Sequence, residues 1–432
     1  MNRQELMNAF VPAAGIDDPH RFAGRREEIE DLTDALHVEG SIPLIFGQRG
    51  LGKSSVALQL TRIAQGDVEL LNELELTHLA LMEEQQFLTF YVMCTDATKN
   101  LAGILSAIVN AMETAKHVRS RDRDARYQLV DKKTRRKLSI KFFELEDTKS
   151  YQARVEELDT SRFSLEERVI HLAEALTDSF GQPVLIVLDE LDRIGPVRGL
   201  SSFLKAASGP LLKFVLVGIG TNYGELLRDH ASLNRQLVAV KVPRMTKAEL
   251  ESIVERTEEY LAEKGEAFEF TPAFSEGAAK IASGFPWFVH VIGQAALVAA
   301  TRDGRRLIGA TQLDTAVQAL ATKRFARQYY DTYLTAVRDS SHREYVLRLF
   351  AMWRDEDVPT SAIYPHARHL GVSNPSTYLG HLTRTECGQV LARSPQQARA
   401  LYRFTDEMFK VYVRARESLY EGIKDEVEAL GL

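Results

Sequence analysis

The sequence predicts an α/β protein with an open, mainly parallel sheet, followed by a helical domain and a C-terminal module of three helices and two strands. Continuous apolar runs, each the length of one strand, are typical of strands buried on both faces. Segments with helical spacing of apolar residues alternate with these runs, as a parallel sheet requires. The apolar runs lie at 43–47, 87–95, 184–188 and 213–222, the last of which ends in Thr221-Asn222.

Length, composition and net charge limit the class of protein to which this chain can belong. With 432 residues, 45% of them hydrophobic, the chain can bury two or three cores. A net charge of -6 argues against a chain that coats nucleic acid or an anionic membrane, so such contact would need a local basic patch. No apolar run reaches the roughly 20 residues that span a bilayer, and the N-terminus lacks a secretion-signal layout. We expect a cytoplasmic protein with no membrane contact.

A glycine-rich stretch joins the run at 43–47 to a predicted helix at 53–64. It reads G-x-x-x-x-G-K-S from Gly47 to Ser54, at a strand-to-helix turn. Backbone N–H groups of such a turn, added to the positive end of the helix, form a concavity for phosphate. Lys53 would neutralise β- and γ-phosphate oxygens, and Ser54 would hold Mg²⁺. The residues assigned to the nucleotide here are Gly47, Gln48, Arg49, Gly50, Leu51, Gly52, Lys53, Ser54 and Ser55.

An acidic pair ends the run at 184–188. Carboxylates at the C-terminal tip of a buried parallel strand face the crevice where ligands of open α/β sheets bind. Asp189 would hold Mg²⁺, and Glu190 would polarise the attacking water as a general base. The alternative is a strand followed by an exposed acidic turn, an interpretation that the nearby phosphate loop makes weaker.

Two further catalytic candidates lie at the end of the run at 213–222 and after it. Asn222 stands at its polar tip, where it could reach the γ-phosphate or the lytic water, although an Asx turn would use the same residue. Arg235 follows the next predicted helix. It is either a solvated charge or an arginine that enters a neighbouring subunit's site.

Together these segments resemble the AAA+ and STAND P-loop ATPases, and within them the origin-recognition clade of replication initiators and related prokaryotic STAND-like ATPases. The glycine-rich stretch at 47–54 matches the Walker A motif of these ATPases, and the acidic pair at 189–190 matches their Walker B motif. In addition, "RFAGRREEIEDLTDAL" (21–36) is similar to the F-x-G-R-x-x-E opening of that group. "VLDELDRI" (187–194) resembles the initiators' acidic motif, "RDHASLNRQL" (228–237) their arginine-finger segment, and "VPRMTKAELESIV" (242–254) the entry into a helical lid.

The resemblance implies roles for residues outside the phosphate loop. Phe22 and Arg25 lie in the opening whose loop contacts adenine in that group. Pro286, in Gly284-Phe285-Pro286, resembles the G-x-P motif of STAND ATPases, where a proline packs near the nucleotide. That motif replaces the arginine that many AAA+ proteins use to sense the γ-phosphate. The resemblance therefore implies slow hydrolysis, and a switch more than a motor.

The predicted organisation has four parts. Residues 1–20 form a loosely attached arm, and 21–242 the P-loop ATPase core. A charged insertion at about 116–160 is either a solvated excursion or a basic contact arm. The helical lid runs over 243–322, and a winged-helix domain over 323–432. This last module carries 12 basic and 7 acidic residues between Lys323 and Arg403.

Two functions of different class follow from these patterns. The first is an ATP-binding and hydrolysing, Mg²⁺-dependent switch that forms homo-oligomers and acts on double-stranded DNA or a DNA-associated partner. In it, the helix at 373–381 would enter the major groove, and Arg393 and Arg399 would contact phosphates. The second is a nucleotide-gated scaffold in a defence or signalling assembly. It would engage a protein effector, hydrolyse little and make no direct DNA contact.

Overall fold

The computed structural model describes residues 3–114, 163–220, 233–320, 327–353, 355–394 and 400–417. The chain divides into two compact units. We call Ala14–Pro243 the α/β unit, and Met1–Ala13 with Arg244–Leu432 the helical unit. The predicted insertion at about 116–160 and Asn222 lie outside the described residues. None of the described helices is both long and apolar enough to cross a membrane.

The α/β unit is built on a five-stranded sheet in the order β2-β3-β4-β1-β5, with every described pair of strands parallel. This confirms the predicted α/β fold with an open parallel sheet. The order places β1 between β4 and β5, so the direction of the onward connection along the sheet reverses between the neighbours β1, which leads to β2, and β4, which leads to β5. Such a reversal opens a crevice at the carboxyl ends of the strands. The strands are β1 Ile42–Gly47, β2 Leu88–Met93, β3 Val184–Asp189, β4 Leu212–Ile219 and β5 Leu237–Lys241.

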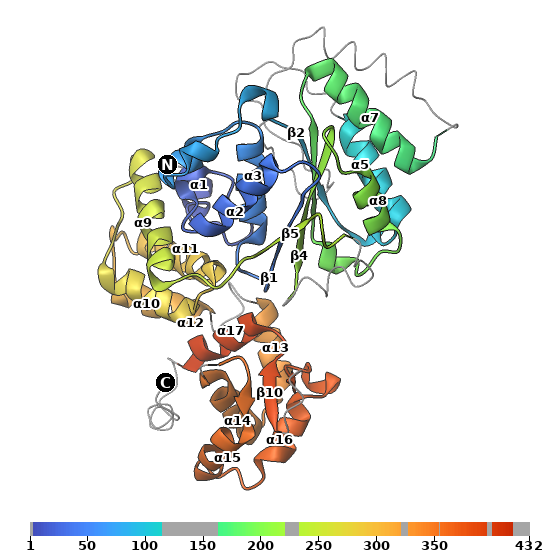
Figure 1. Ribbon diagram of the computed structural model, residues 1–432. Helices are drawn as coiled ribbons and strands as arrows, with labels where there is room; N and C mark the ends of the chain where they lie inside the picture. Colours follow the sequence, from blue (N-terminus) through green and yellow to red (C-terminus); the bar gives the residue numbers. More distant parts are fainter. Residues whose placement is uncertain are drawn as a thin grey trace. The chain divides into compact units, whose positions relative to one another are not determined.

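Helices cover both faces of this sheet (Figure 1). α2 and α3 lie on one face, and α5, α7 and α8 lie on the other. The main core lies under the second group, where apolar side chains of α5 and α7 pack against inward-facing residues of β1 to β4. The helices are α2 Arg26–His37, α3 Lys53–Ala64, α4 Glu69–Glu73, α5 Leu101–Thr114, α7 Leu165–Phe180 and α8 Leu200–Ala207.

The helical unit begins with a helical layer. A two-stranded parallel sheet of β6 and β7 ties the loops between its helices. α11 is buried along most of its length, and α9, α10 and α12 pack against it. The elements are α9 Lys247–Glu263, β6 Glu269–Phe270, α10 Pro272–Ala282, α11 Pro286–Arg302, β7 Leu307–Ile308 and α12 Ala310–Leu320.

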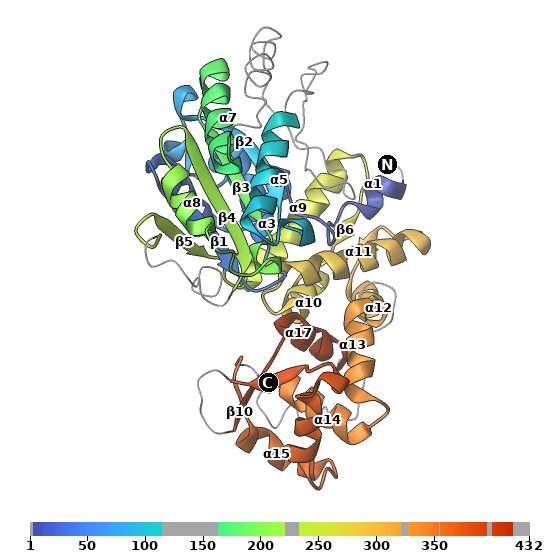
Figure 2. The same ribbon diagram turned by 90° about the vertical axis from the view of Figure 1, so that its right-hand side faces the viewer.

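The C-terminal part of the same unit has the order two helices, strand, two helices, two strands and helix. β8, β10 and β9 form an antiparallel sheet in that order, and α14, α15 and α16 pack together beside it (Figure 2). The separation of lid and winged helix at 322 stays a prediction. The elements are α13 Arg327–Val337, α14 Ser341–Met352, β8 Val358–Pro359, α15 Thr360–His369, α16 Pro375–Leu382, β9 Leu391–Arg393, β10 Leu401–Phe404 and α17 Glu407–Glu417.

The N-terminal segment differs from the loosely attached arm that we expected. α1 (Arg3–Met7) and the residues after it pack on α11, and Phe10 is 1% exposed. A Cβ on Gly293 would lie 2.3 Å from the Phe10 ring, so the glycine makes room for it. The Trp287 indole N–H donates to the Pro12 carbonyl at 2.9 Å. This burial of an aromatic ring explains why the segment is ordered.

Candidate nucleotide site

The phosphate loop lies between β1 and α3, as predicted. Gly50 and Gly52 have φ of 78° and 90°, a left-handed conformation that favours glycine. α3 starts at Lys53 with Gly52 at its N-cap, and no side chain of the described residues caps it. Its first N–H groups are therefore available to an anion, and the helix dipole adds to the attraction.

Lys53 is buried, with 8% of its surface exposed, and its Nζ donates to the Gln48 carbonyl at 2.8 Å. Burial lowers the pKa of Lys53 to about 8, while the charges of Asp189 and Asp192 oppose this shift. A bound polyanion would favour the charged ammonium. Among the described residues this is the cation placed to receive phosphate oxygens.

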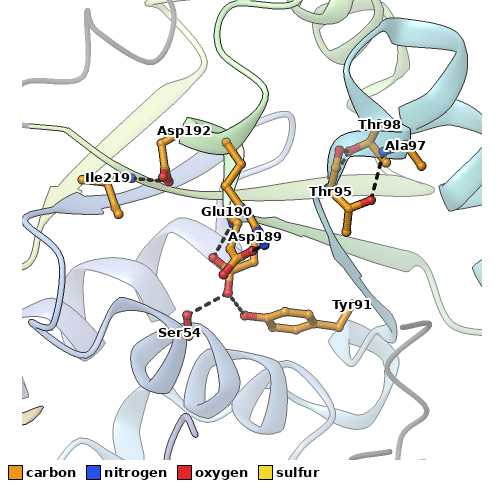
Figure 3. Close-up of polar contacts among 10 residues, drawn as sticks. Ser54, Tyr91, Thr95, Ala97, Thr98, Asp189, Glu190, Asp192 and Ile219 are labelled. Atoms are coloured by element: carbon orange, nitrogen blue, oxygen red, sulfur yellow. Dashed lines mark hydrogen bonds and ion pairs between the residues drawn. The ribbon is translucent and has the colours of Figure 1, made fainter. Parts of the chain in front are cut away.

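Asp189 is the centre of a hydrogen-bond cluster at the tip of β3 (Figure 3). Its Oδ2 accepts from Ser54 Oγ at 2.8 Å and from the Tyr91 hydroxyl at 2.6 Å. Its Oδ1 accepts from the Glu190 N–H at 2.7 Å. Burial raises the pKa of Asp189, whereas these hydrogen bonds act in the opposite direction. The structure thus joins two predicted metal ligands, Ser54 and Asp189.

Tyr91 was not predicted, because its strand reads as apolar. It lies on β2 and is paired in register with Val187 of β3, two residues before Asp189. Burial, with the adjacent Asp189 carboxylate, raises the pKa of Tyr91 well above its usual range, so the phenol is a donor. The available signal was a tyrosine in a buried strand, since a buried hydroxyl needs a partner.

Hard oxygen donors of this kind fit Mg²⁺, which takes one or two protein oxygens and completes its shell with water and phosphate. Ser54 Oγ and the Asp189 carboxylate are adjacent at the strand edge and next to the phosphate loop. The described residues contain no group of three or more His, Cys, Asp or Glu side chains that could hold a metal alone. The donor set therefore suits an ion that arrives with a phosphate ligand.

Glu190 follows Asp189 in the left-handed region, with φ of 60°. Its carboxylate accepts from Arg193 Nη1 at 2.5 Å, and its side chain is 35% exposed. The left-handed conformation is rare for a residue with a side chain and turns the chain sharply after β3. Asp192, two residues on, accepts from the Ile219 N–H at 2.8 Å and ties the tip of β4 to this turn.

Other predicted nucleotide residues have internal partners. Ser55 Oγ accepts from the Ile16 N–H at 3.0 Å, so this hydroxyl anchors the segment before α2. Phe22 is 4% exposed, within the core. The Arg25 guanidinium donates to the carbonyls of Leu51 and Pro243. Contact of these three residues with nucleotide stays a prediction.

Two predicted residues lie elsewhere. Pro286 is the first residue of α11, in the helical unit. A Cβ on the neighbouring Gly284 would lie 2.6 Å from the Arg244 side chain, which explains the glycine of this motif. Arg235 is exposed in the turn before β5. Neither position tests its predicted role.

Residues 21–216 match the family model described as AAA ATPase domain. No curated protein matches the chain.

Several solved structures align with most of the chain at low sequence identity and with TM-scores below 0.5. The Aeropyrum pernix ORC2 protein in ADPNP-ADP complexes is 16% identical, with 91% of this chain and 94% of that chain covered at a TM-score of 0.44. A Walker-type ATPase of Pyrococcus abyssi is 15% identical, with 91% and 96% covered at 0.49. The Thermotoga maritima RuvB Holliday junction branch migration motor is 16% identical, with 92% and 96% covered at 0.41.

Proposed function

We propose that this protein is a slow, Mg²⁺-dependent ATP switch of the P-loop class, a proposal that the match of residues 21–216 to an AAA ATPase domain model supports. The observation that carries the proposal is the convergence of an uncapped glycine-rich helix start, Lys53 and the Ser54–Asp189 pair at one sheet edge. Backbone N–H groups bind the phosphates, and Lys53 neutralises β- and γ-oxygens.

Ser54 and Asp189 hold Mg²⁺, which offsets negative charge on the phosphates when bound. Tyr91 and the Glu190 N–H keep the Asp189 carboxylate fixed. Glu190 takes a proton from the attacking water as general base. Its carboxylate is held in an ion pair with Arg193 and has to leave that pair to reach the water, which supports slow turnover.

The C-terminal module acts as a winged helix that passes the nucleotide state to double-stranded DNA. Its order of helices and strands, with β9 and β10 after α16, supports this assignment. Ser373, Asn374, Ser376 and Thr377 are exposed around the start of α16, and Arg393 is exposed on β9. Homo-oligomers complete the ATPase site through Arg235, whose exposure leaves it accessible to a neighbour.

Calorimetry of the full chain with ATP and MgCl₂, followed by phosphate-release kinetics, tests the ATPase. The wild type should bind saturably, and Glu190→Gln should retain binding while turnover falls by about 100-fold. Glu174→Gln, which removes another carboxylate of the α/β unit, is the matched control and should change neither quantity. Absence of saturable heat in the wild type would refute ATP binding, and unchanged turnover in Glu190→Gln would exclude that residue as base.

DNA contact has a separate test. Labelled duplex should shift at low salt with the wild type, and the shift should weaken as salt rises. Arg393→Glu should lose it, whereas Arg302→Glu, with the same charge change on α11, should retain it. No shift at low salt would favour the nucleotide-gated scaffold.

A further inference from the structure

Arg25 has an unusual environment within the α/β unit. It is 3% exposed, adopts a left-handed conformation with φ of 67°, and precedes α2. Its guanidinium donates to the Leu51 carbonyl at 2.9 Å and to the Pro243 carbonyl at 2.8 Å, and it pairs with Glu28 at 3.1 Å. One buried cation therefore joins three distant stretches of the chain.

The Leu51 carbonyl belongs to the phosphate loop. In a planar trans peptide the carbonyl and the following N–H point in opposite directions. Arg25 holds the Leu51 carbonyl toward itself, so the Gly52 N–H points away from Arg25. A carbonyl turned the other way would present negative charge to an anion, and its N–H would be lost to the loop.

The Pro243 carbonyl belongs to the last residue of the α/β unit, and Arg244 begins the helical unit. This part of the chain is closely tied to the start of the phosphate loop. The Val242 N–H donates to the Phe46 carbonyl at 2.8 Å, and a Cβ on Gly47 would lie 2.6 Å from the Val242 carbonyl oxygen. Because these contacts are close, a small movement of the phosphate loop would also shift the backbone at Val242, just before the chain leaves the α/β unit.

We propose that Arg25 is a positioning residue. It orients the phosphate loop through the Leu51 carbonyl, and through the Pro243 carbonyl it transmits to the end of the α/β unit whether nucleotide is bound at the loop. The inference rests on the proposed binding of ATP at this loop. The two terminal nitrogens of the planar Arg25 guanidinium donate to two carbonyls at once. A lysine ammonium on a flexible stem cannot reproduce this geometry. Glu28 balances the buried charge.

Arg25→Lys tests the proposal, because it keeps the positive charge but removes the planar guanidinium that donates to both carbonyls. ATP–Mg²⁺ affinity by calorimetry should fall by about tenfold, as expected for loss of one charged hydrogen bond. Hydrogen exchange of peptides covering 241–247 should slow on ATP addition in the wild type, and should not slow in Arg25→Lys saturated with ATP. Glu28→Gln, which leaves both carbonyl contacts in place, is the control and should keep the ATP-dependent slowing.

The proposal would be overturned if Arg25→Lys bound ATP–Mg²⁺ with wild-type affinity. It would also be overturned if hydrogen exchange at 241–247 slowed in Arg25→Lys at saturating ATP as it does in the wild type. The wild type supplies a second measurement in case the variant does not fold. Exchange at 49–53 and at 241–247 should slow with the same ATP midpoint, and slowing at the loop alone would overturn the coupling. If the wild type binds no ATP, the proposed function itself fails, which calorimetry reports separately.

Discussion

Two buried lysines of the α/β unit, Lys53 in the phosphate loop and Lys213 at the start of β4, differ in what surrounds their ammonium groups. Burial lowers the pKa of each to about 8. Lys213 Nζ donates to Ser41 Oγ at 3.1 Å and to three carbonyls at 2.6 to 3.0 Å, those of Ala35, Leu36 and Val38. Lys53 donates to the Gln48 carbonyl.

The contrast separates a structural cation from one that we propose binds a ligand. Lys213 has four acceptors for its three N–H groups, and three of these acceptors are carbonyls at the C-terminal end of α2 or just after it, which need donors. Within the part of the chain that the structure describes, Lys53 has one acceptor for its three N–H groups and lies beside a helix start that no side chain caps. A desolvated cation with few protein partners is costly, and a ligand that supplies them offsets the cost.

The largest expected effect is loss of ligand binding at Lys53. Lys53→Met should lower ATP–Mg²⁺ affinity by about 100-fold or more, because a charged contact to phosphate is lost. The urea midpoint of the empty protein should stay close to that of the wild type. Calorimetry and urea unfolding measure the two quantities, and retained affinity would break the comparison.

Lys213→Met should give the opposite pattern. It removes the ammonium donor from the Leu36 carbonyl, whereas the Ala35 and Val38 carbonyls keep donors in the Ser41 hydroxyl and the Ser41 N–H. The free energy of unfolding should therefore fall by about 1 to 3 kcal/mol, the range for one buried group left unpaired. The affinity of the folded variant for ATP should stay within threefold of the wild type. Loss of ATP binding at full stability would instead place Lys213 in the site.

The pH dependence of stability sharpens the same contrast. The pKa of Lys213 is about 8 in the folded chain against an ordinary value of 10.5, so between these values the unfolded chain holds the extra proton. Stability of the wild type relative to Lys213→Met should therefore rise with pH, by on the order of 2 kcal/mol from pH 8 to 10. Urea unfolding across this range checks it. A flat difference would mean that the carbonyls keep the ammonium charged.

A smaller effect is expected at Tyr91. Tyr91→Phe removes one of three donors to Asp189 and leaves Ser54 and the Glu190 N–H in place. Mg²⁺-dependent ATP affinity should fall about fivefold, the range of one hydrogen bond. Tyr402→Phe, in the C-terminal module, is a control that should leave affinity unchanged. An equal loss of affinity without Mg²⁺ would show that Tyr91 acts on the loop and not on the carboxylate.

Local pattern predicted the elements that carry the chemistry. The predicted helix at 53–64 is α3, and the acidic pair does follow β3 at the sheet edge. These succeeded because glycine spacing and apolar runs are local signals of backbone geometry. The two-residue β8 was missed, since so short a strand has no period of its own.

Side-chain partners could not be predicted in the same way. Tyr91 reaches Asp189 across two strands that are 98 residues apart in sequence, and Arg25 reaches Pro243 at a separation of 218. Neither has a spacing rule, because register and topology, not local sequence, bring them together. Ser55 was assigned to nucleotide for its place in the loop motif, whereas its hydroxyl accepts from Ile16.

The burial of Phe10 affects how the protein can be divided into fragments. Residues 3–13 pack with the chain after Pro243, so the polypeptide crosses between units at 13–14 as well as at 243–244. A protease cut after Pro243 would therefore yield two fragments that co-purify, because the Phe10 side chain of one packs against Gly293 of the other. A recombinant piece starting at Arg244 would leave that hollow open to water, and fusing residues 3–13 to it should restore its solubility.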